Sequence, residues 1–182
     1  MTNQNKRPKY LIWLLVIMTI SIPLIYYFAL APTQEGNSNS DPTQVAKPEQ
    51  PEPQFKNEGS LEFISQEGAL LARINIEIAE TPEEKNQGLM FRRSMADTLG
   101  MLFIYSQPQP QSFWMKDCYF SQDIIFVDEN LRIVTIQKNT VPFSEKSLPS
   151  SKDAQYIVEV VGGFSDRNGI KEGDFIKFDI AV

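Results

Sequence analysis

The residues best suited to chemistry lie in the stretch QSFWMKDCYFSQDIIFVDENLRIVTIQ, residues 111–137. It holds one of the two tryptophans (Trp114), the single cysteine (Cys118), and Asp123 directly before an apolar run. A carboxylate at the start of a strand can act as a base, bind a cation or bind a sugar hydroxyl. It can also fix a loop by accepting hydrogen bonds from a neighbouring arginine. The stretch therefore predicts either a ligand site or a structural contact around Asp123.

Two arginines, Arg92 and Arg93, are the expected partners of Asp123 in the structural hypothesis. They follow the apolar segment GLMF. Neighbouring positions of an extended chain face opposite sides, so one of them should point inward. In the functional alternative, Arg92 binds an anionic group of a ligand. Both hypotheses hold together if the pair lines a pocket.

Phe113 and Trp114 are adjacent large aromatic residues in a run of strand-like composition. Alternation implies that only one of them faces the core, which leaves the other free to stack on a sugar or peptide ring. We therefore expect a binding surface formed by loops around four candidate ligand-binding residues. These are Arg92, Trp114, Lys116 and Asp123.

Catalysis by Cys118 is not expected. Lys116 would lower the pKa of its thiol, but Asp117 opposes this, and no histidine is present to take the proton. The absence of histidine also excludes the usual zinc sites and Ser–His–Asp chemistry. One cysteine cannot form an internal disulfide. The sequence therefore predicts no cofactor and no metal, and the catalytic residues, if any, are unknown.

The net charge of −6 disfavours nucleic acid as a partner, because no basic stripe is available to neutralise phosphates. The N-terminus predicts a membrane partner instead. Residues 10–30 carry no charge and are long enough to span a bilayer core as a helix, and basic residues precede them in residues 1–9. The positive-inside rule places residues 1–9 in the cytoplasm and the rest of the chain outside it. The alternative is a secreted protein, cleaved near Ala31.

Residues 31–57 are rich in proline and polar residues and predict a disordered linker. Residues 58–182 have a globular composition, sufficient for one compact core. Strands are expected where apolar residues alternate or run together, and a helix where Thr81 and Pro82 precede two glutamates. The expected strands span residues 72–80, 100–105, 112–115, 124–127, 132–137, 154–161 and 175–180, with helical turns at 81–88 and 162–169.

These elements predict an α+β fold, a β-rich domain with an antiparallel or mixed, barrel-like sheet and one or two short helices. The segment SQPQPQ, residues 106–111, should form a loop outside the central ladder, because proline cannot donate to it.

The order of the segments GLMFRRSM, GMLFIY, FWMKDC…QDIIFVDENLRIV and YIVEVVGG…NGIKEGD resembles the prokaryotic family called domain of unknown function 192. The resemblance covers roughly residues 71–178 and implies a small β-rich domain, often secreted or membrane-anchored, with no settled activity. This chain has Asp117 and Cys118 where the family typically has Asn-Thr. It has Ser121 and Gln122 where the family has Pro-Leu.

Three functions follow as hypotheses. The main one is a non-enzymatic, membrane-tethered ligand-binding or interaction module of the cell envelope. The second is an envelope-polymer hydrolase or transferase that uses Asp123 with Asp117 or Glu159, which requires two carboxylates across one cleft. The third is a structural assembly partner, which a large exposed apolar patch would favour.

Overall fold

The computed structural model describes residues 52–181, which belong to one compact unit. The predicted membrane anchor, residues 10–30, lies outside the described residues, as does most of the predicted linker. Within the described part, no helix has the length and apolar character needed to cross a bilayer.

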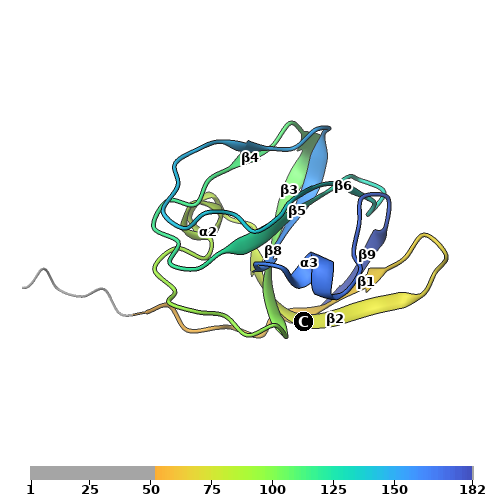
Figure 1. Cartoon of the computed structure of the whole chain (residues 1–182), viewed down its shortest axis with the longest axis horizontal. Helices are drawn as coiled ribbons and strands as arrows, with labels where there is room; N and C mark the ends of the chain where they lie inside the picture. The colour runs from red at the N-terminus through yellow and green to blue at the C-terminus, as the bar shows by residue number, and fades with distance from the viewer. Residues whose placement is uncertain (1–51, 182) are drawn as a thin grey trace, which may run out of the picture. The chain divides into compact units, whose positions relative to one another are not determined.

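Seven strands form one mixed sheet in the order β6-β5-β8-β3-β2-β1-β9, in which β2 and β3 are parallel and the other neighbours are antiparallel (Figure 1). A second, two-stranded sheet pairs β4 with β7. The strands are β1 Gly59–Ile64, β2 Leu70–Ala79, β3 Leu99–Gln109, β4 Ser112–Phe113, β5 Gln122–Val127, β6 Ile133–Gln137, β7 Leu148–Pro149, β8 Ala154–Val161 and β9 Phe175–Ile180, and the helices are α2 Pro82–Gln87 and α3 Phe164–Arg167.

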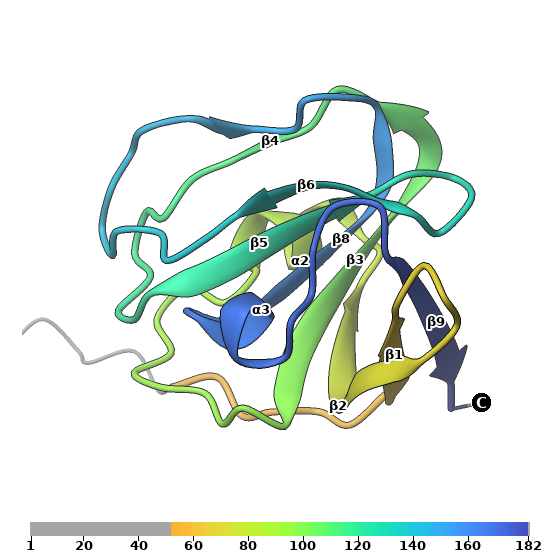
Figure 2. The same cartoon turned by 45° about the vertical axis from the view of Figure 1, so that its right-hand side comes forward.

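The large sheet curls until its two edge strands approach each other at one end (Figure 2). The N–H of Ile133 donates to the carbonyl of Asp174 at 2.8 Å, and the N–H of Gly173 donates to Ile133 at 2.8 Å. An isolated bridge joins Arg132 to Phe175. No strand ladder continues from β6 to β9, so the sheet is strongly curled but is not a closed barrel. The expectation of a mixed β-rich sheet with short helices is confirmed, and closure is not.

Each face of the sheet carries its own apolar core, because the central strands are buried on both sides. All six residues of β5 are buried. One core includes Phe63, Ile125, Val158 and Phe164 of α3. The other core lies on the opposite face and includes Phe103, Met115, Ile124, Phe126 and Ile157.

Helix α2 begins where the sequence predicts. The side chain of Thr81 accepts a hydrogen bond from the N–H of Glu84, and the Glu84 carboxylate accepts one from the N–H of Thr81. This reciprocal capping, with Pro82 at the first helical position, stabilises a helix of six residues that has no buried side chain. The predicted hairpin of β5 and β6 and the helical turn before β9 are also present.

Two predictions about strands need correction. Strand β3 runs on to Gln109, through most of the predicted loop, with a break in pairing between Ile104 and Gln109. Pro108 lies inside that break, where it has no ladder hydrogen bond to lose. The predicted strand at 112–115 shrinks to β4, because the backbone of Met115 bonds to Ser144 instead.

The last residues of the predicted linker also pack against the domain. The N–H of Arg93 donates to the Glu52 carboxylate at 2.8 Å, and the N–H of Lys56 donates to Glu77. Pro53 and Phe55 are half-buried. Residues 52–57 are therefore ordered against the sheet, although their composition is that of a spacer.

Candidate ligand-binding pocket

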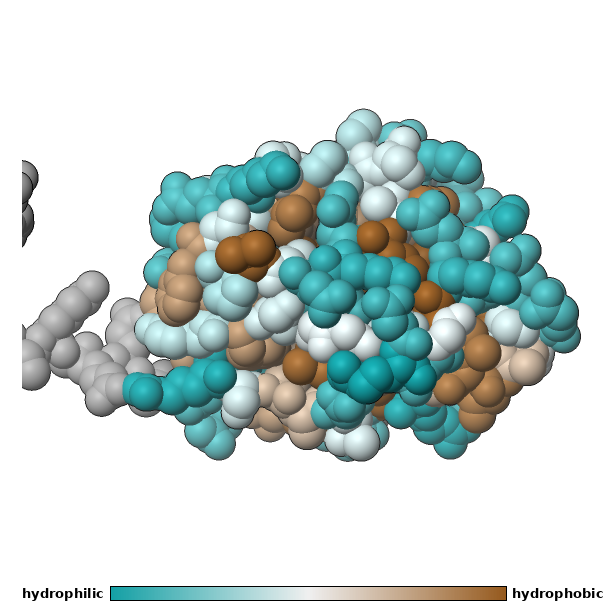
Figure 3. All heavy atoms as spheres, in the orientation of Figure 1, coloured by the Kyte–Doolittle hydropathy of each residue, from teal (hydrophilic) through white to brown (hydrophobic). Residues whose placement is uncertain are grey.

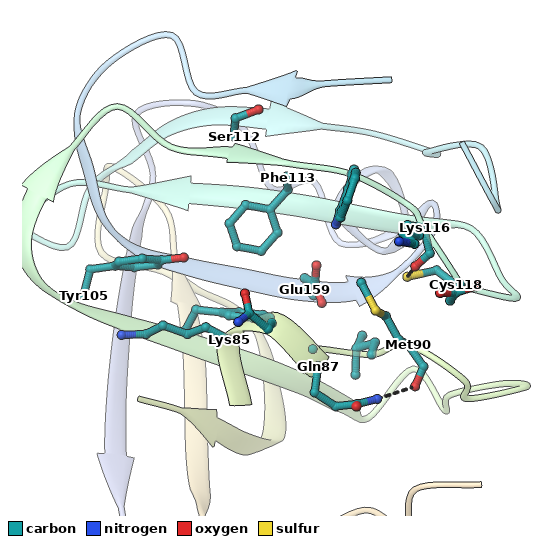
Figure 4. A pocket seen from close by; sticks show the side chains of 15 residues that line it. Lys85, Gln87, Met90, Tyr105, Ser112, Phe113, Lys116, Cys118 and Glu159 are labelled. Atoms are coloured by element: carbon teal, nitrogen blue, oxygen red, sulfur yellow. Dashed lines mark hydrogen bonds between the residues drawn. The ribbon is translucent and has the colours of Figure 1, made fainter. Parts of the chain in front are cut away.

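A cavity of about 420 Å3 opens between α2, β3 and the segment that leads from β4 to Cys118 (Figure 4). Aromatic side chains form its walls, one carboxyl group lies at its floor and two lysines stand at its mouth. The lining residues are Lys85, Asn86, Gln87, Gly88, Leu89, Met90, Phe103, Tyr105, Ser112, Phe113, Trp114, Lys116, Asp117, Cys118 and Glu159.

Glu159 supplies the carboxyl group at the floor. It lies in β8, opposite Met101 of β3 and Ile124 of β5, so its side chain shares their apolar face of the sheet. The residue is 4% exposed. Its Oε2 atom has no hydrogen-bond partner among the described residues. Burial raises the pKa of this carboxyl to about 8, against a smaller opposing effect of Arg92, so it is mostly uncharged at neutral pH.

Gly88 brings the end of α2 close to this carboxyl. Its backbone angles, φ 46° and ψ −135°, are strained for any residue with a Cβ atom. A Cβ atom at this position would lie 3.3 Å from the Phe103 ring and 3.7 Å from Oε2 of Glu159. Glycine therefore both ends the helix and leaves the floor of the cavity open.

Phe113 forms a rigid part of the wall. Its ring packs edge-on against Phe103 at 5.1 Å and against Phe126 at 5.8 Å, with interplanar angles of 86° in both cases. Edge-to-face contacts of this kind stabilise by about 0.5–1.5 kcal/mol beyond burial. Trp114, the next residue, is 45% exposed. The prediction that one of the two faces the core and the other the surface is confirmed.

Both lysines rest on aromatic rings. The Lys85 Nζ atom lies 4.4 Å from the centre of the Tyr105 ring, and the Lys116 Nζ atom lies 5.2 Å from that of Trp114. Cation–π attraction of about 0.5–1 kcal/mol at exposed sites favours these positions. The two lysines therefore give the mouth of the cavity a positive charge. The acidic residues that line the cavity are Asp117 and Glu159.

Cys118 is buried beside the cavity, with its thiol donating to the Lys116 carbonyl at 3.4 Å. Burial first, and then the Glu159 carboxyl, raise the pKa of the thiol to about 12. The thiolate required for nucleophilic attack is therefore scarce at neutral pH. The prediction that Cys118 is not catalytic agrees with this environment.

Asp123 is fully buried on the opposite face of the sheet and does not line the cavity. Its Oδ1 atom accepts from the N–H groups of Asn139 at 2.8 Å and Gly163 at 3.0 Å, and its Oδ2 atom accepts from Ser165 at 2.8 Å. The carboxylate thus ties the start of α3, which lacks a capping side chain of its own, to β5. The structural role predicted for Asp123 is confirmed. The prediction that Arg92 is its partner is wrong, because backbone amides hold Asp123.

Arg92 points inward and Arg93 is exposed, as alternation predicts. The guanidinium of Arg92 forms a buried ion pair with Glu77, whose other carboxylate oxygen accepts from the N–H of Lys56. The acidic partner of Arg92 is therefore Glu77 of β2. The sequence did not suggest it, because Glu77 sits where alternation in β2 predicts an exposed side chain.

Of the four predicted ligand-binding residues, the structure brings Trp114 and Lys116 together at the cavity and places Arg92 and Asp123 elsewhere. Glu159, named from the sequence only as a helper of Asp123, takes the central position. A charged residue inside the apolar segment YIVEVV was the available signal, because β8 is buried on both faces. Among the described residues, no group of three or more acidic or cysteine side chains could hold a metal ion.

Exposed aromatic side chains also occur outside the set of residues that line the cavity. Tyr119 and Phe143 are 47% and 57% exposed and pack together at 5.0 Å, edge to face. On the face shown in Figure 3, apolar residues form small areas separated by hydrophilic ones. That view shows no broad apolar surface of the kind expected for an assembly partner.

Comparisons with known proteins support the fold. A family model described as DUF192, Uncharacterized ACR, matches residues 63–178. A crystal structure of a candidate transcription regulator from Sinorhizobium meliloti is 31% identical with a TM-score of 0.65, covering 69% of this chain and 98% of its own. A protein of unknown function from Novosphingobium aromaticivorans is 34% identical with a TM-score of 0.61, covering 65% and 83%. No curated protein matches the chain.

The first of these structures has a consequence for experiments. Because 98% of that chain aligns, the domain described here makes up nearly all of the chain that was crystallised. A chain consisting almost only of this domain therefore folds, and residues 48–182, the compact unit of this chain, are expected to fold on their own.

Proposed function

This chain belongs to the family of domain of unknown function 192, and we propose that it is a membrane-tethered binding module outside the cytoplasm, whose small-molecule ligand enters the cavity above Glu159. The observation that carries the proposal is the cavity of about 420 Å3, with aromatic walls and a buried carboxyl at its floor whose Oε2 atom has no hydrogen-bond partner in the described part of the chain. Aromatic walls together with polar groups that can orient a bound molecule are typical of ligand sites.

The membrane location rests on the uncharged residues 10–30 and the basic residues before them. It is tested by fractionating cells that express the full chain. We expect the chain in the membrane fraction, released by detergent and not by high salt, with the domain open to protease added from outside. A soluble, shortened chain would favour cleavage near Ala31 instead.

A binding role is favoured over catalysis because the predicted catalytic carboxylate is unsuited to it. Asp123 is occupied by three backbone amides and faces away from the cavity. Cys118 has a raised pKa and no histidine to accept its proton. The description of the Sinorhizobium protein as a candidate transcription regulator is not extended to this chain, since a net charge of −6 disfavours DNA.

Thermal unfolding of residues 48–182 tests the binding function against envelope glycans, peptides and small metabolites. A ligand present at 100 times its dissociation constant stabilises by about 2.7 kcal/mol. We expect Trp114→Ala to abolish the shift, because Trp114 lines the cavity and is exposed. Tyr119→Ala is the matched control, an equally exposed aromatic residue that does not line the cavity. A shift that survives Trp114→Ala contradicts the assignment of the cavity.

The second candidate is a hydrolase or transferase, and one observation favours it. Glu159 and Asp117 both line the cavity, and the raised pKa of Glu159 suits a general acid. This pair replaces the one expected from the sequence. Turnover of an envelope glycan or peptide that is lost in both Glu159→Gln and Asp117→Asn would establish this candidate. Binding of an unchanged ligand supports the first proposal.

A further inference from the structure

The inference concerns the chemical class of the ligand and rests on the proposed function. The Oε2 atom of Glu159 is a buried acceptor with no hydrogen-bond donor among the described residues. The nearby Arg92 pairs with Glu77 through Nη2, and its own buried Nε also has no partner there, so it lowers the pKa of Glu159 only through its charge. An unpartnered buried acceptor destabilises the empty cavity. A ligand that brings a donor to the Glu159 carboxyl reduces this cost.

The surroundings of Glu159 favour a donor that carries positive charge. Phe103 and Phe113 lie beside it, together with the exposed Trp114. Aromatic faces attract ammonium groups, and a carboxylate at the bottom of such a site supplies the counter-charge. In Figure 4 the Glu159 carboxyl lies below the Phe113 ring, in the middle of the residues that line the cavity.

The mouth of the cavity favours a negatively charged group on the ligand. Lys85 and Lys116 have their ammonium groups on the Tyr105 and Trp114 rings, in the positions described above. Neither lysine has an ion-pair partner among the described residues. In Figure 4 the two lysines stand on opposite sides of the cavity, so a ligand with a carboxylate or phosphate at its outer end would find an available cation on either side.

We propose that the cavity binds a zwitterionic small molecule, with a primary ammonium group on Glu159 and a carboxylate or phosphate group at the mouth, near Lys85 or Lys116. The apolar part between these ends lies along Phe113 and Trp114. Free amino acids, peptide ends and amine-bearing envelope building blocks belong to this class. The proposal goes beyond a general binding role because it fixes the orientation of the ligand.

Binding should release a proton. The Glu159 carboxyl is mostly neutral at pH 7 in the empty cavity, since burial raises its pKa to about 8. An ammonium ion beside it favours the ionised form, so affinity should rise between pH 6 and pH 8. The charged and titratable groups around it are Arg92, Cys118, Tyr105, Lys85, Lys116 and Asp117.

A matched series of probes tests the ligand class on residues 48–182. The probes are 6-aminohexanoate, hexylamine, hexanoate and 6-hydroxyhexanoate, with 4-aminobutanoate and 8-aminooctanoate to vary the length. Trp114 is the only tryptophan in residues 48–182, so its fluorescence reports binding at the cavity. Calorimetry in two buffers of different ionisation enthalpy measures the proton released.

We expect an amino acid of the series to bind at least tenfold more tightly than 6-hydroxyhexanoate, with proton release near pH 7. The variant Glu159→Gln resembles the neutral acid, so it should fold. We expect it to weaken binding of the amino acid probe at least tenfold. The double variant of Lys85→Ala and Lys116→Ala should remove the preference for aminohexanoate over hexylamine. Lys152→Ala, an exposed lysine away from the cavity, is the control.

Equal binding of the hydroxyl and ammonium probes, or unchanged binding in Glu159→Gln, would overturn the proposal. If none of the amines binds but a glycan or peptide does so in a Trp114-dependent way, the ligand class is wrong and the binding function stands. If no probe and no compound of the panel binds, the proposed ligand class and the proposed binding function are both wrong.

Discussion

Asp123 and Glu159 lie one register position apart on neighbouring strands, yet they face opposite sides of the sheet. Asp123 of β5 is opposite Val160 of β8, and Glu159 is opposite Ile124. Paired residues share a face and successive residues alternate, so the two carboxyl groups enter different cores. They cannot flank one substrate bond. This relationship separates a carboxylate that holds the fold from one that faces the cavity.

Asp123→Asn should destabilise the domain without a specific effect on ligand binding. The amide side chain loses the charge that strengthens three backbone hydrogen bonds and presents an N–H group to one of these donors. Hydrogen bonds to charged groups contribute about 1.5–3 kcal/mol each, and they are not additive, so we expect a loss of about 2–4 kcal/mol. Urea unfolding measures it. A variant of normal stability that no longer binds would show that Asp123 serves a ligand.

Arg92→Met should leave Glu77 as a buried, unpaired charge. Removing one partner of such a pair costs about 3–5 kcal/mol, whereas apolar residues at both positions are often neutral. The double variant Arg92→Met with Glu77→Leu should therefore recover much of the loss in urea unfolding. Arg73→Ala, which breaks an exposed pair with Glu62, is the control and should have a far smaller effect. Equal losses in the two single arginine variants would contradict the assigned burial.

Stability should fall as pH rises from about 5 to 8, because of Glu159. Its pKa is raised from 4.5 to about 8, so the folded protein keeps a proton that the unfolded chain has lost. The slope is at most about 1.4 kcal/mol per pH unit. The chain has no histidine, so few other groups titrate in this range. Thermal unfolding from pH 5 to 9 should show a weaker dependence in Glu159→Gln, and parallel curves would argue against a buried acid.

Cys118 should react slowly with a thiol reagent such as DTNB while the protein is folded. With a pKa raised to about 12, the thiolate at pH 8 is about 1000-fold scarcer than for an ordinary thiol. Absorbance in buffer and in urea compares the folded and unfolded rates. Rapid reaction of the folded protein would indicate an accessible, activated thiol.

Gly88→Ala should reduce both stability and binding. The substitution forces a positive φ on alanine and places a methyl group against Phe103 at the floor of the cavity. Strain of this kind costs about 1–3 kcal/mol. Gly68→Ala is the matched control, since Gly68 also has a positive φ and a Cβ atom there meets nothing within 4 Å. Loss of binding in the control as well would remove Gly88 from the site.

The sequence by itself determined most of the local structure. Alternation in Ala72–Glu80 and the capping residues Thr81 and Pro82 depend on neighbouring residues, so they could be interpreted without a tertiary structure. The same holds for the opposite orientation of Phe113 and Trp114, but the tertiary structure decided which of the two is exposed. The loop predicted around Pro108 was wrong, because a proline can lie within a long strand where the pairing is interrupted.

Only the tertiary structure decided which carboxyl group reaches the cavity. The pairing register of β5, β8 and β3 places Glu159 between Met101 and Ile124, and the partners of Arg92 and Asp123 come from distant segments of the chain. A one-residue shift in register would exchange the two faces of β8, and no local pattern fixes that register when both faces are apolar. Local sequence therefore determines the elements, and long-range packing determines the candidate site.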